Sequence, residues 1–266
     1  MKNIKKNMRV LRELLYLRFH GLMVFRLDFF APFFVDGSLF LVQILAFSAV
    51  YANVDTIEGW GKGEMILFIG TFSLLNAINM TVPFFGLNQI PWKVRSGELD
   101  LYLSKPISPL FRLSFECISP GSIPLIIMSI FIILYGAMAS EISFEAAQIG
   151  SYIFWIAVME ILYYDMEVII RSVSLYMVSM ARMDQIEEAG LDLCMKLPGT
   201  AFRGVYKLVF YLILPYGIMA TLPVQSIIGD MNVWRGLYGV TVVLAFSVLT
   251  GLVWRCGLKH YNSASS

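Results

Sequence analysis

The chain has 266 residues, of which 58% are hydrophobic and 15% are charged, and its formal net charge is +1. Soluble domains carry about a quarter charged residues, so this composition argues against a soluble protein and predicts one that crosses a membrane several times. A net charge near zero gives no indication of a nucleic-acid partner. The few thiols and imidazoles are scattered, which argues against a disulfide framework or a metal site: Cys117, Cys194, Cys256, His20 and His260.

Residues 1–28 are expected to form an amphipathic helix in the membrane interface. The segment holds seven Lys and Arg residues, and its apolar residues fall on one helical face: Met8, Leu11, Leu15, Phe19 and Leu22. This pattern is typical of a helix that lies on anionic head groups. An ordinary amphipathic soluble helix is the alternative, but the segment continues directly into an apolar run. No cleavable signal peptide is expected, because the segment has no uninterrupted apolar core.

Six apolar runs follow, and a membrane span needs about 20 mostly apolar residues. The expected spans are 29–51, 64–89, 114–139, 147–170, 204–228 and 236–257. Prolines within the second, third and fifth runs predict kinked helices. The predicted fold class is therefore an all-α polytopic membrane protein. Its interfacial helix, 1–28, precedes a transmembrane domain of six helices, 29–266.

The basic residues predict how the chain is oriented. Seventeen Lys and Arg residues lie in the N-terminal segment, the loops 90–113 and 171–203, and the C-terminal end, against two in the alternate loops. Cytoplasmic loops carry the excess of Lys and Arg. Both termini and the loops 90–113 and 171–203 are therefore expected in the cytoplasm. The centre of 171–203 is expected to form a short helix or hinge, which Pro198-Gly199 ends before the fifth span.

The loop Ile90–Leu113, called the polar segment below, is a short polar island between two apolar runs. Pro91 can start a helical turn, and Ser96-Gly97 can end it. A second turn over 98–104 should end at Lys105-Pro106, because the residue before a proline avoids the helical region. We expect a small projection that receives force from a soluble partner.

The polar segment also resembles a known family. The string Arg95-Ser96-Gly97-Glu98-Leu99-Asp100, followed by Leu103-Ser104-Lys105-Pro106-Ile107, resembles the R-x-G-x-L-D…L-x-[KR]-P signature of ABC-2 type transporter permeases. The stretch from Trp254 to Ser263 resembles the W-x-x-G-L-x-x-Y-x-S/G close of the standalone permease subunits in that family. The resemblance covers essentially the whole chain. It implies the permease subunit of an exporter in the bacterial cytoplasmic membrane, which works by alternating access.

The same resemblance implies the partners. A separate cytosolic ATPase dimer would bind ATP and magnesium, and this chain would bind no cofactor. A second permease subunit, either identical or different, would complete the translocation path. The residues expected to couple to the ATPase are Trp92, Lys93, Arg95, Gly97, Glu98, Leu99, Asp100, Leu103, Lys105 and Pro106. Apolar members, with Val94 and Leu101, would anchor the segment or fill a groove, and the charged Lys93, Arg95, Glu98 and Asp100 would lie at its rim. The chain has no phosphate-binding G-x-x-x-x-G-K-[ST] loop and no catalytic constellation, so it is not expected to be an enzyme.

Three acidic residues fall in or near the fourth expected span: Glu160, Asp165 and Glu167. Ionisable groups inside a bilayer are costly and are candidates for function. Glu167 can pair with Arg171 one turn later, so structural pairing and a role in the transport path both stay open. Glu160 lies deeper and is the candidate for the transport path. An ion- or proton-coupled secondary transporter is the alternative function and would depend on Glu160. A non-transporting membrane anchor is a further alternative.

Overall fold

The computed structural model describes residues 13, 26–140, 145–177 and 181–261. Within these ranges the chain forms α-, 3-10 and π-helices and no β-strand, which confirms the all-α fold class. The expected interfacial helix, 1–28, lies almost entirely outside the described residues and stays a prediction.

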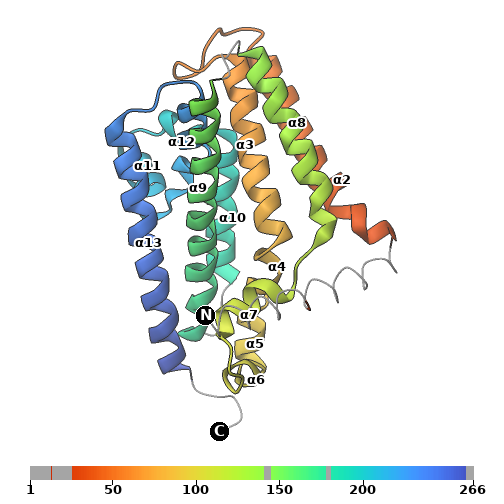
Figure 1. Cartoon of the computed structure of the whole chain (residues 1–266), viewed down its shortest axis with the longest axis vertical. Coiled ribbons are helices and arrows are strands. Elements are labelled where there is room, and N and C mark those ends of the chain that lie inside the picture. Colours follow the sequence, from red (N-terminus) through yellow and green to blue (C-terminus); the bar gives the residue numbers. More distant parts are fainter. Residues whose placement is uncertain (1–12, 14–25, 141–144, 178–180, 262–266) are drawn as a thin grey trace.

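Five long helices lie side by side and make the body of the molecule (Figure 1). They are α2 (Arg26–Val50), α3 (Lys62–Thr81), α8 (Ile123–Ala139), α9 (Ala146–Ser172) and α13 (Val233–His260). Among the described residues, four stretches are long and apolar enough to cross a membrane: Phe33–Val50, Lys62–Thr81, Pro120–Ala139 and Val233–His260. The helix α9 coincides with the fourth expected span, 147–170. The count of six spans itself stays a prediction.

Two of the expected spans are interrupted at prolines. Helix α3 ends at Thr81, and Pro83 precedes the short α4 (Phe84–Leu87). Pro120 opens the 3-10 turn η1 (Pro120–Ser122), which separates α7 (Pro109–Glu116) from α8. Proline lacks the N–H that would continue a helix. The expected kinks are therefore found in both places.

Helices α3 and α8 pack closely because glycines lie at their contact. A Cβ atom added to Gly136 of α8 would lie 2.4 Å from the backbone nitrogen of Leu67 in α3, and one added to Gly70 would lie 2.8 Å from that of Ile133. Small residues at such contacts allow two helix backbones to approach, as is common between membrane helices. Replacing either glycine would push the two helices apart.

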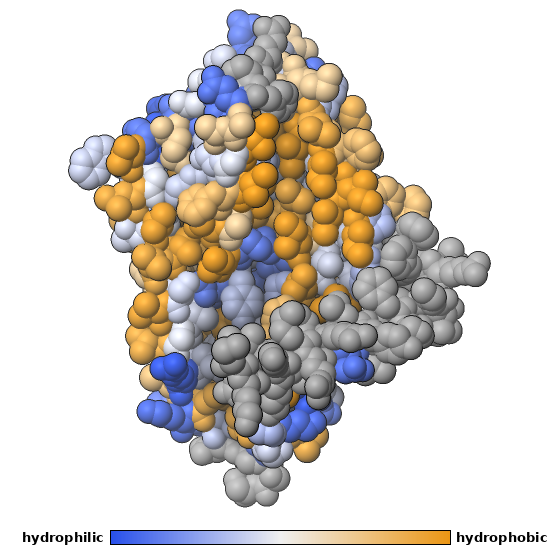
Figure 2. Space-filling view, viewed as in Figure 1, coloured by the Kyte–Doolittle hydropathy of each residue, from blue (hydrophilic) through white to orange (hydrophobic). Residues whose placement is uncertain are grey.

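The outer faces of the helices are apolar. Figure 2 shows hydrophobic side chains as a broad band along the molecule, with hydrophilic ones gathered mainly toward its two ends. The exposed apolar residues of α8 include Ile127, Phe131 and Met138, and those of α13 include Leu244 and Val248. Apolar surface of this extent is typical of a protein that faces lipid or a partner.

The expected placement of 171–203 as a cytoplasmic loop is wrong. Its centre is helical, as expected, but the helix runs along the bundle and does not stay at the end where α9 finishes. Arg171, at the end of α9, contacts Asp184 at 2.7 Å, near the start of α10 (Ala181–Lys196). Arg203 contacts Glu58 at 2.9 Å, in the loop that joins α2 to α3 at the other end of the bundle. Sixteen helical residues rise about 24 Å, so α10 covers most of the distance between the two ends.

The expected span 204–228 is also wrong as a single crossing. It contains α11 (Gly204–Leu208), the π-helix η4 (Val209–Ile213), the 3-10 helix η5 (Pro215–Ile218) and α12 (Thr221–Ile227), with a bend of 84° at its break. The segment begins next to Arg203, which contacts Glu58 in the loop between α2 and α3. It ends next to Gly229, which lies beside Gln148 near the start of α9. Both ends therefore lie at the same end of the bundle. We call residues 204–228 the re-entrant hairpin.

The two corrections leave the predicted orientation unchanged. If α10 and not 204–228 connects the two ends of the bundle after α9, then Lys196 and Arg203 lie at the end opposite the polar segment. Lys207, in the re-entrant hairpin, joins them there. Fifteen basic residues then oppose five, which still agrees with the rule that basic residues stay inside.

Candidate functional site

The polar segment forms two short helices that project from one end of the bundle (Figure 1). Helix α5 (Ile90–Arg95) has Pro91 in its first turn, and α6 (Asp100–Leu103) follows after a reversal at Gly97. Gly97 has φ of 76°, a backbone conformation that glycine adopts at little cost. The two expected turns and their ends are thus confirmed.

An apolar cluster fixes the polar segment to the bundle. Its buried members are Leu87, Ile90, Leu99, Tyr102, Leu113, Val168, Leu175 and Trp254. Leu99 is fully buried, so it anchors the segment as expected. Because Val168 belongs to α9 and Trp254 to α13, the segment rests on both helices.

The two stretches that carry the family resemblance meet in this cluster. Trp254, Leu258 and Tyr261 follow one face of the end of α13 and pack against the polar segment. The Tyr261 hydroxyl lies beside Asp100, and burial together with this carboxylate raises the pKa of Tyr261. Sequence analysis did not bring these stretches together, although the i, i+4, i+7 spacing of the three residues indicates a common face.

Four polar side chains stabilise the interior of the polar segment. Lys93 Nζ donates to the Tyr102 hydroxyl at 2.8 Å, and that hydroxyl donates to Glu116 Oε1 at 2.7 Å. Arg112 Nε donates to Glu116 Oε2 at 3.0 Å. Burial and the Glu116 hydrogen bond raise the pKa of Tyr102, so its hydroxyl stays protonated and keeps donating.

The expected rim position of Lys93 is wrong, because the side chain is only 8% exposed. Its amine is 3.9 Å from both Glu98 and Glu116, inside the segment. Of the other expected coupling residues, Gly97, Glu98 and Asp100 are half-buried, and Trp92, Arg95, Leu103, Lys105 and Pro106 are exposed. The exposed apolar side chains Trp92, Leu101 and Leu103 are 53%, 63% and 41% exposed. The outward face is therefore apolar and basic.

Glu160 lines a cavity of about 380 Å³ between α3, α7 and α9. Its neighbours in the lining are mostly apolar: Ile78, Val82, Pro83, Phe115, Ala157 and Ile161, with Ser114 and Tyr164. The Glu160 Oε2 atom has no hydrogen-bond partner among the described residues. A carboxyl group in this position is suited to bind a proton or a cationic group.

A second ionic cluster joins α9 to α10. The expected pair of Glu167 and Arg171 is confirmed, with 3.4 Å between Oε2 and Nη2. Arg171 Nη1 also lies 2.7 Å from both Glu187 and Asp184. Sequence analysis missed these two partners because the short helix or hinge expected within 171–203 was placed in a cytoplasmic loop and not against α9.

The remaining acidic residue of the fourth span has a structural partner. Asp165 accepts a hydrogen bond from Ser247 of α13 at 2.5 Å, so it links two helices. Within the described ranges, no group of three or more His, Cys, Asp or Glu residues could hold a metal ion.

Comparison with protein families matches residues 38–265 to the family described as ABC-2 family transporter protein. Comparison with curated proteins and with solved structures gives no significant match. The matched range includes the polar segment, α10, the re-entrant hairpin and α13. The chain is thus a membrane permease of ABC type and belongs to the ABC-2 family of transporter proteins.

Proposed function

We propose that this chain is the permease subunit of an ATP-driven exporter in the bacterial cytoplasmic membrane, with both termini in the cytoplasm. A separate ATPase dimer would bind ATP and magnesium, and the polar segment would be its contact on this chain. The observation that carries the proposal is the outward face of the segment, where Trp92, Leu101 and Leu103 are exposed beside Arg95 and Lys105. Such a face can enter an apolar groove with an acidic rim.

The packing of the polar segment supports a role in transmitting motion. Leu99 and Tyr102 fix its two short helices to α9 and α13 through the apolar cluster. Gly86 of α4 lies against the backbone of Leu113, so α7 is fixed to the end of α3. Displacement of the segment by a closing ATPase would therefore tilt several helices together and open a path away from the cytoplasm.

A second permease subunit is part of the proposal, since one copy of six helices supplies half of the core that an ABC exporter needs. The exposed apolar faces of α2, α8 and α13 offer surface for such a partner as well as for lipid. The partner can be a second copy or a related chain. Purification of the intact complex, with every chain identified and counted, distinguishes the two.

The test is co-purification of the ATPase with the tagged permease from its native membrane. Trp92→Ala is expected to reduce the recovered ATPase, because an exposed tryptophan at an interface centre can contribute about 2 kcal/mol or more. Asp100→Lys is expected to reduce it by another route, because Asp100 is half-buried beside Tyr261 and a lysine there would displace the polar segment from the end of α13. Trp234→Ala is the matched control, because Trp234 is 78% exposed at the opposite end of the bundle. Equal ATPase recovery with Trp92→Ala, Asp100→Lys and Trp234→Ala would refute the coupling role.

One observation favours a second candidate, an ion- or proton-coupled transporter. Glu160 lies in an apolar cavity with an unpaired carboxyl oxygen, as expected of an ion-binding group in a membrane. In that case transport would stop when the proton gradient is removed and would not depend on ATP. Glu160→Gln would abolish it, whereas Trp92→Ala would leave it intact.

A further inference from the structure

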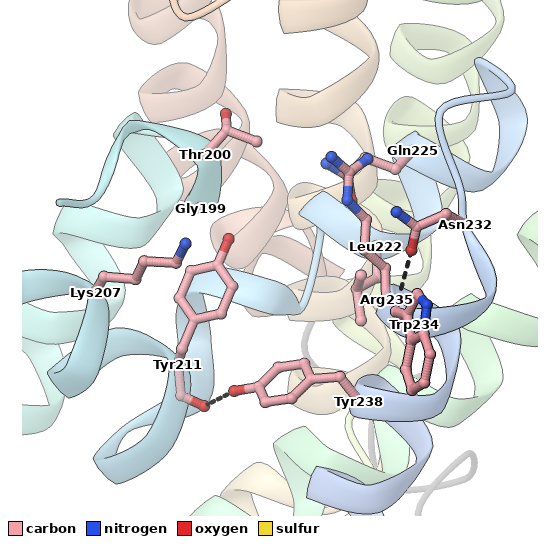
Figure 3. A pocket seen from close by; sticks show the side chains of 10 residues that line it. All are labelled: Gly199, Thr200, Lys207, Tyr211, Leu222, Gln225, Asn232, Trp234, Arg235 and Tyr238. Carbon is pink, nitrogen blue, oxygen red and sulfur yellow. Dashed lines mark hydrogen bonds between the residues drawn. The ribbon is translucent and has the colours of Figure 1, made fainter.

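A pocket of about 470 Å³ is lined by polar and aromatic side chains (Figure 3). It lies at the end of the bundle opposite the polar segment, where α11 and α12 are drawn in Figure 1. It opens to the surface between the re-entrant hairpin, the preceding turn at Gly199 and Thr200, and the start of α13. We call it the hairpin cavity. Neither the family match nor the proposed contact with an ATPase gives it a role, and the inference below does not depend on either.

The hairpin cavity has two cationic side chains and no carboxylate in its lining. Lys207 enters from the hairpin, where its ammonium lies 5.7 Å from the ring centre of Tyr211, and it forms no ion pair with any described residue. Arg235 enters from α13 and forms an ion pair with the Asp230 carboxylate through Nη1, at 2.6 Å. The rest of its guanidinium stays available. The unpaired ammonium of Lys207 and the remaining N–H groups of Arg235 line one pocket, and together they favour a ligand with anionic oxygen atoms.

Neutral donors complete the site. Gln225 is nearly fully buried, at 3% exposed, and lines the cavity. The side-chain oxygen of Asn232 accepts the backbone N–H of Arg235 at 2.8 Å, so its amide NH₂ is left as a donor. Amide donors beside cations suit the oxygen atoms of a phosphate ester, which form strong charge-assisted hydrogen bonds.

The mouth of the hairpin cavity is aromatic and lies at the level where the helices end. Trp234 is 78% exposed at its edge. Tyr238 donates its hydroxyl to the carbonyl of Tyr211, which is in the π-helical turn, and so fixes the two walls together. Tryptophan and tyrosine are typical of the head-group level of a membrane, and their faces can cover the organic part of a ligand.

We propose that the hairpin cavity binds a phosphate ester through Lys207 and Arg235, with Trp234 against the organic group. Two sources supply this chemistry, the head group of an anionic phospholipid and a soluble phosphate monoester. Both would enter from the same end of the bundle.

The test uses the full chain in phosphatidylcholine nanodiscs. One arm titrates it with glycerol 3-phosphate in a calorimeter. The other arm presents equal phosphatidylglycerol and phosphatidylcholine and measures the lipids that the protein retains by native mass spectrometry. Lys207→Gln and Arg235→Gln are each expected to weaken binding about tenfold, since a hydrogen bond to a charged group contributes that much. Lys196→Gln is the matched control, because Lys196 is exposed and pairs with Asp192 outside the cavity.

Each outcome decides the proposal. Saturable binding of glycerol 3-phosphate that weakens in both cavity variants, but not in Lys196→Gln, supports a soluble ligand. Selective retention of phosphatidylglycerol with the same pattern supports a lipid. If the native chain binds neither probe, or if all three variants bind like the native chain, the proposal is wrong. Because Lys207 is exposed, its variant is expected to fold, and Lys207→Arg should retain binding.

Discussion

Replacing Gly86 by alanine tests how the polar segment is fixed to the bundle. A Cβ atom at this position would lie 1.9 Å from the backbone oxygen of Leu113, whereas ordinary contact begins at 3.4 Å. Helices α4 and α7 would therefore have to separate by about 1.5 Å. The obstructing atom is backbone, so no rotamer change relieves the clash. Overpacking of this kind lowers the free energy of unfolding by about 1–3 kcal/mol.

The matched control for this change is Gly150→Ala in α9, where an added Cβ would meet nothing within 4 Å. Alanine inside a helix is favoured over glycine by about 0.5–1 kcal/mol, so the control should melt at the same temperature as the native chain or slightly higher. The assay is thermal unfolding followed by circular dichroism in one detergent. Gly86→Ala should melt several degrees lower. If Gly86→Ala melts at the same temperature as Gly150→Ala, the close contact of α4 with α7 is refuted.

Three further changes probe the ionic and backbone features. Arg171→Met leaves Glu167 and Glu187 buried without their cation and should destabilise the protein by about 3–5 kcal/mol, measured by denaturant unfolding; an unchanged midpoint would argue against the cluster. Tyr102→Phe removes the bond to Glu116 and should lower stability by about 1–2 kcal/mol. Because the pKa of Tyr102 is raised in the folded state, this difference should hold up to about pH 10, where an unfolded tyrosine ionises, and shrink above it. Gly97→Ala should cost about 1–2 kcal/mol, since its φ of 76° disfavours a side chain; recovery of the ATPase at the native level would show that the turn tolerates it.

Local chemistry made the polar segment predictable. Pro91, Gly97 and Pro106 determine where its turns start and stop, and these effects act within a few residues of each position. The burial of Lys93 was not predictable in the same way. Its environment depends on Glu116, which lies in a separate helix and reaches Lys93 only after α7 folds back.

Hydropathy located the long helices correctly, but it predicted a single membrane span at 204–228, where the structure has the re-entrant hairpin. The re-entrant hairpin is as apolar as a span, because residues such as Tyr216 and Ile218 are buried among other helices. An apolar segment is one that avoids water, and its hydropathy does not tell whether it crosses the bundle or turns back to the end where it began. The placement of α10 was missed for the opposite reason. Its acidic residues indicate a segment in water, whereas Glu187 is buried and paired with Arg171.

The pairing of α10 with α9 has a consequence for how the protein is made. Helix α10 is not among the described stretches that are long and apolar enough to cross a membrane, and it carries Asp184 and Glu187 in its first half. Synthesis proceeds from the N-terminus, and Arg171 therefore precedes Asp184 and Glu187 out of the ribosome. We therefore expect α10 to dock against α9 after α9 has formed, with Arg171 supplying the counter-charge for Asp184 and Glu187.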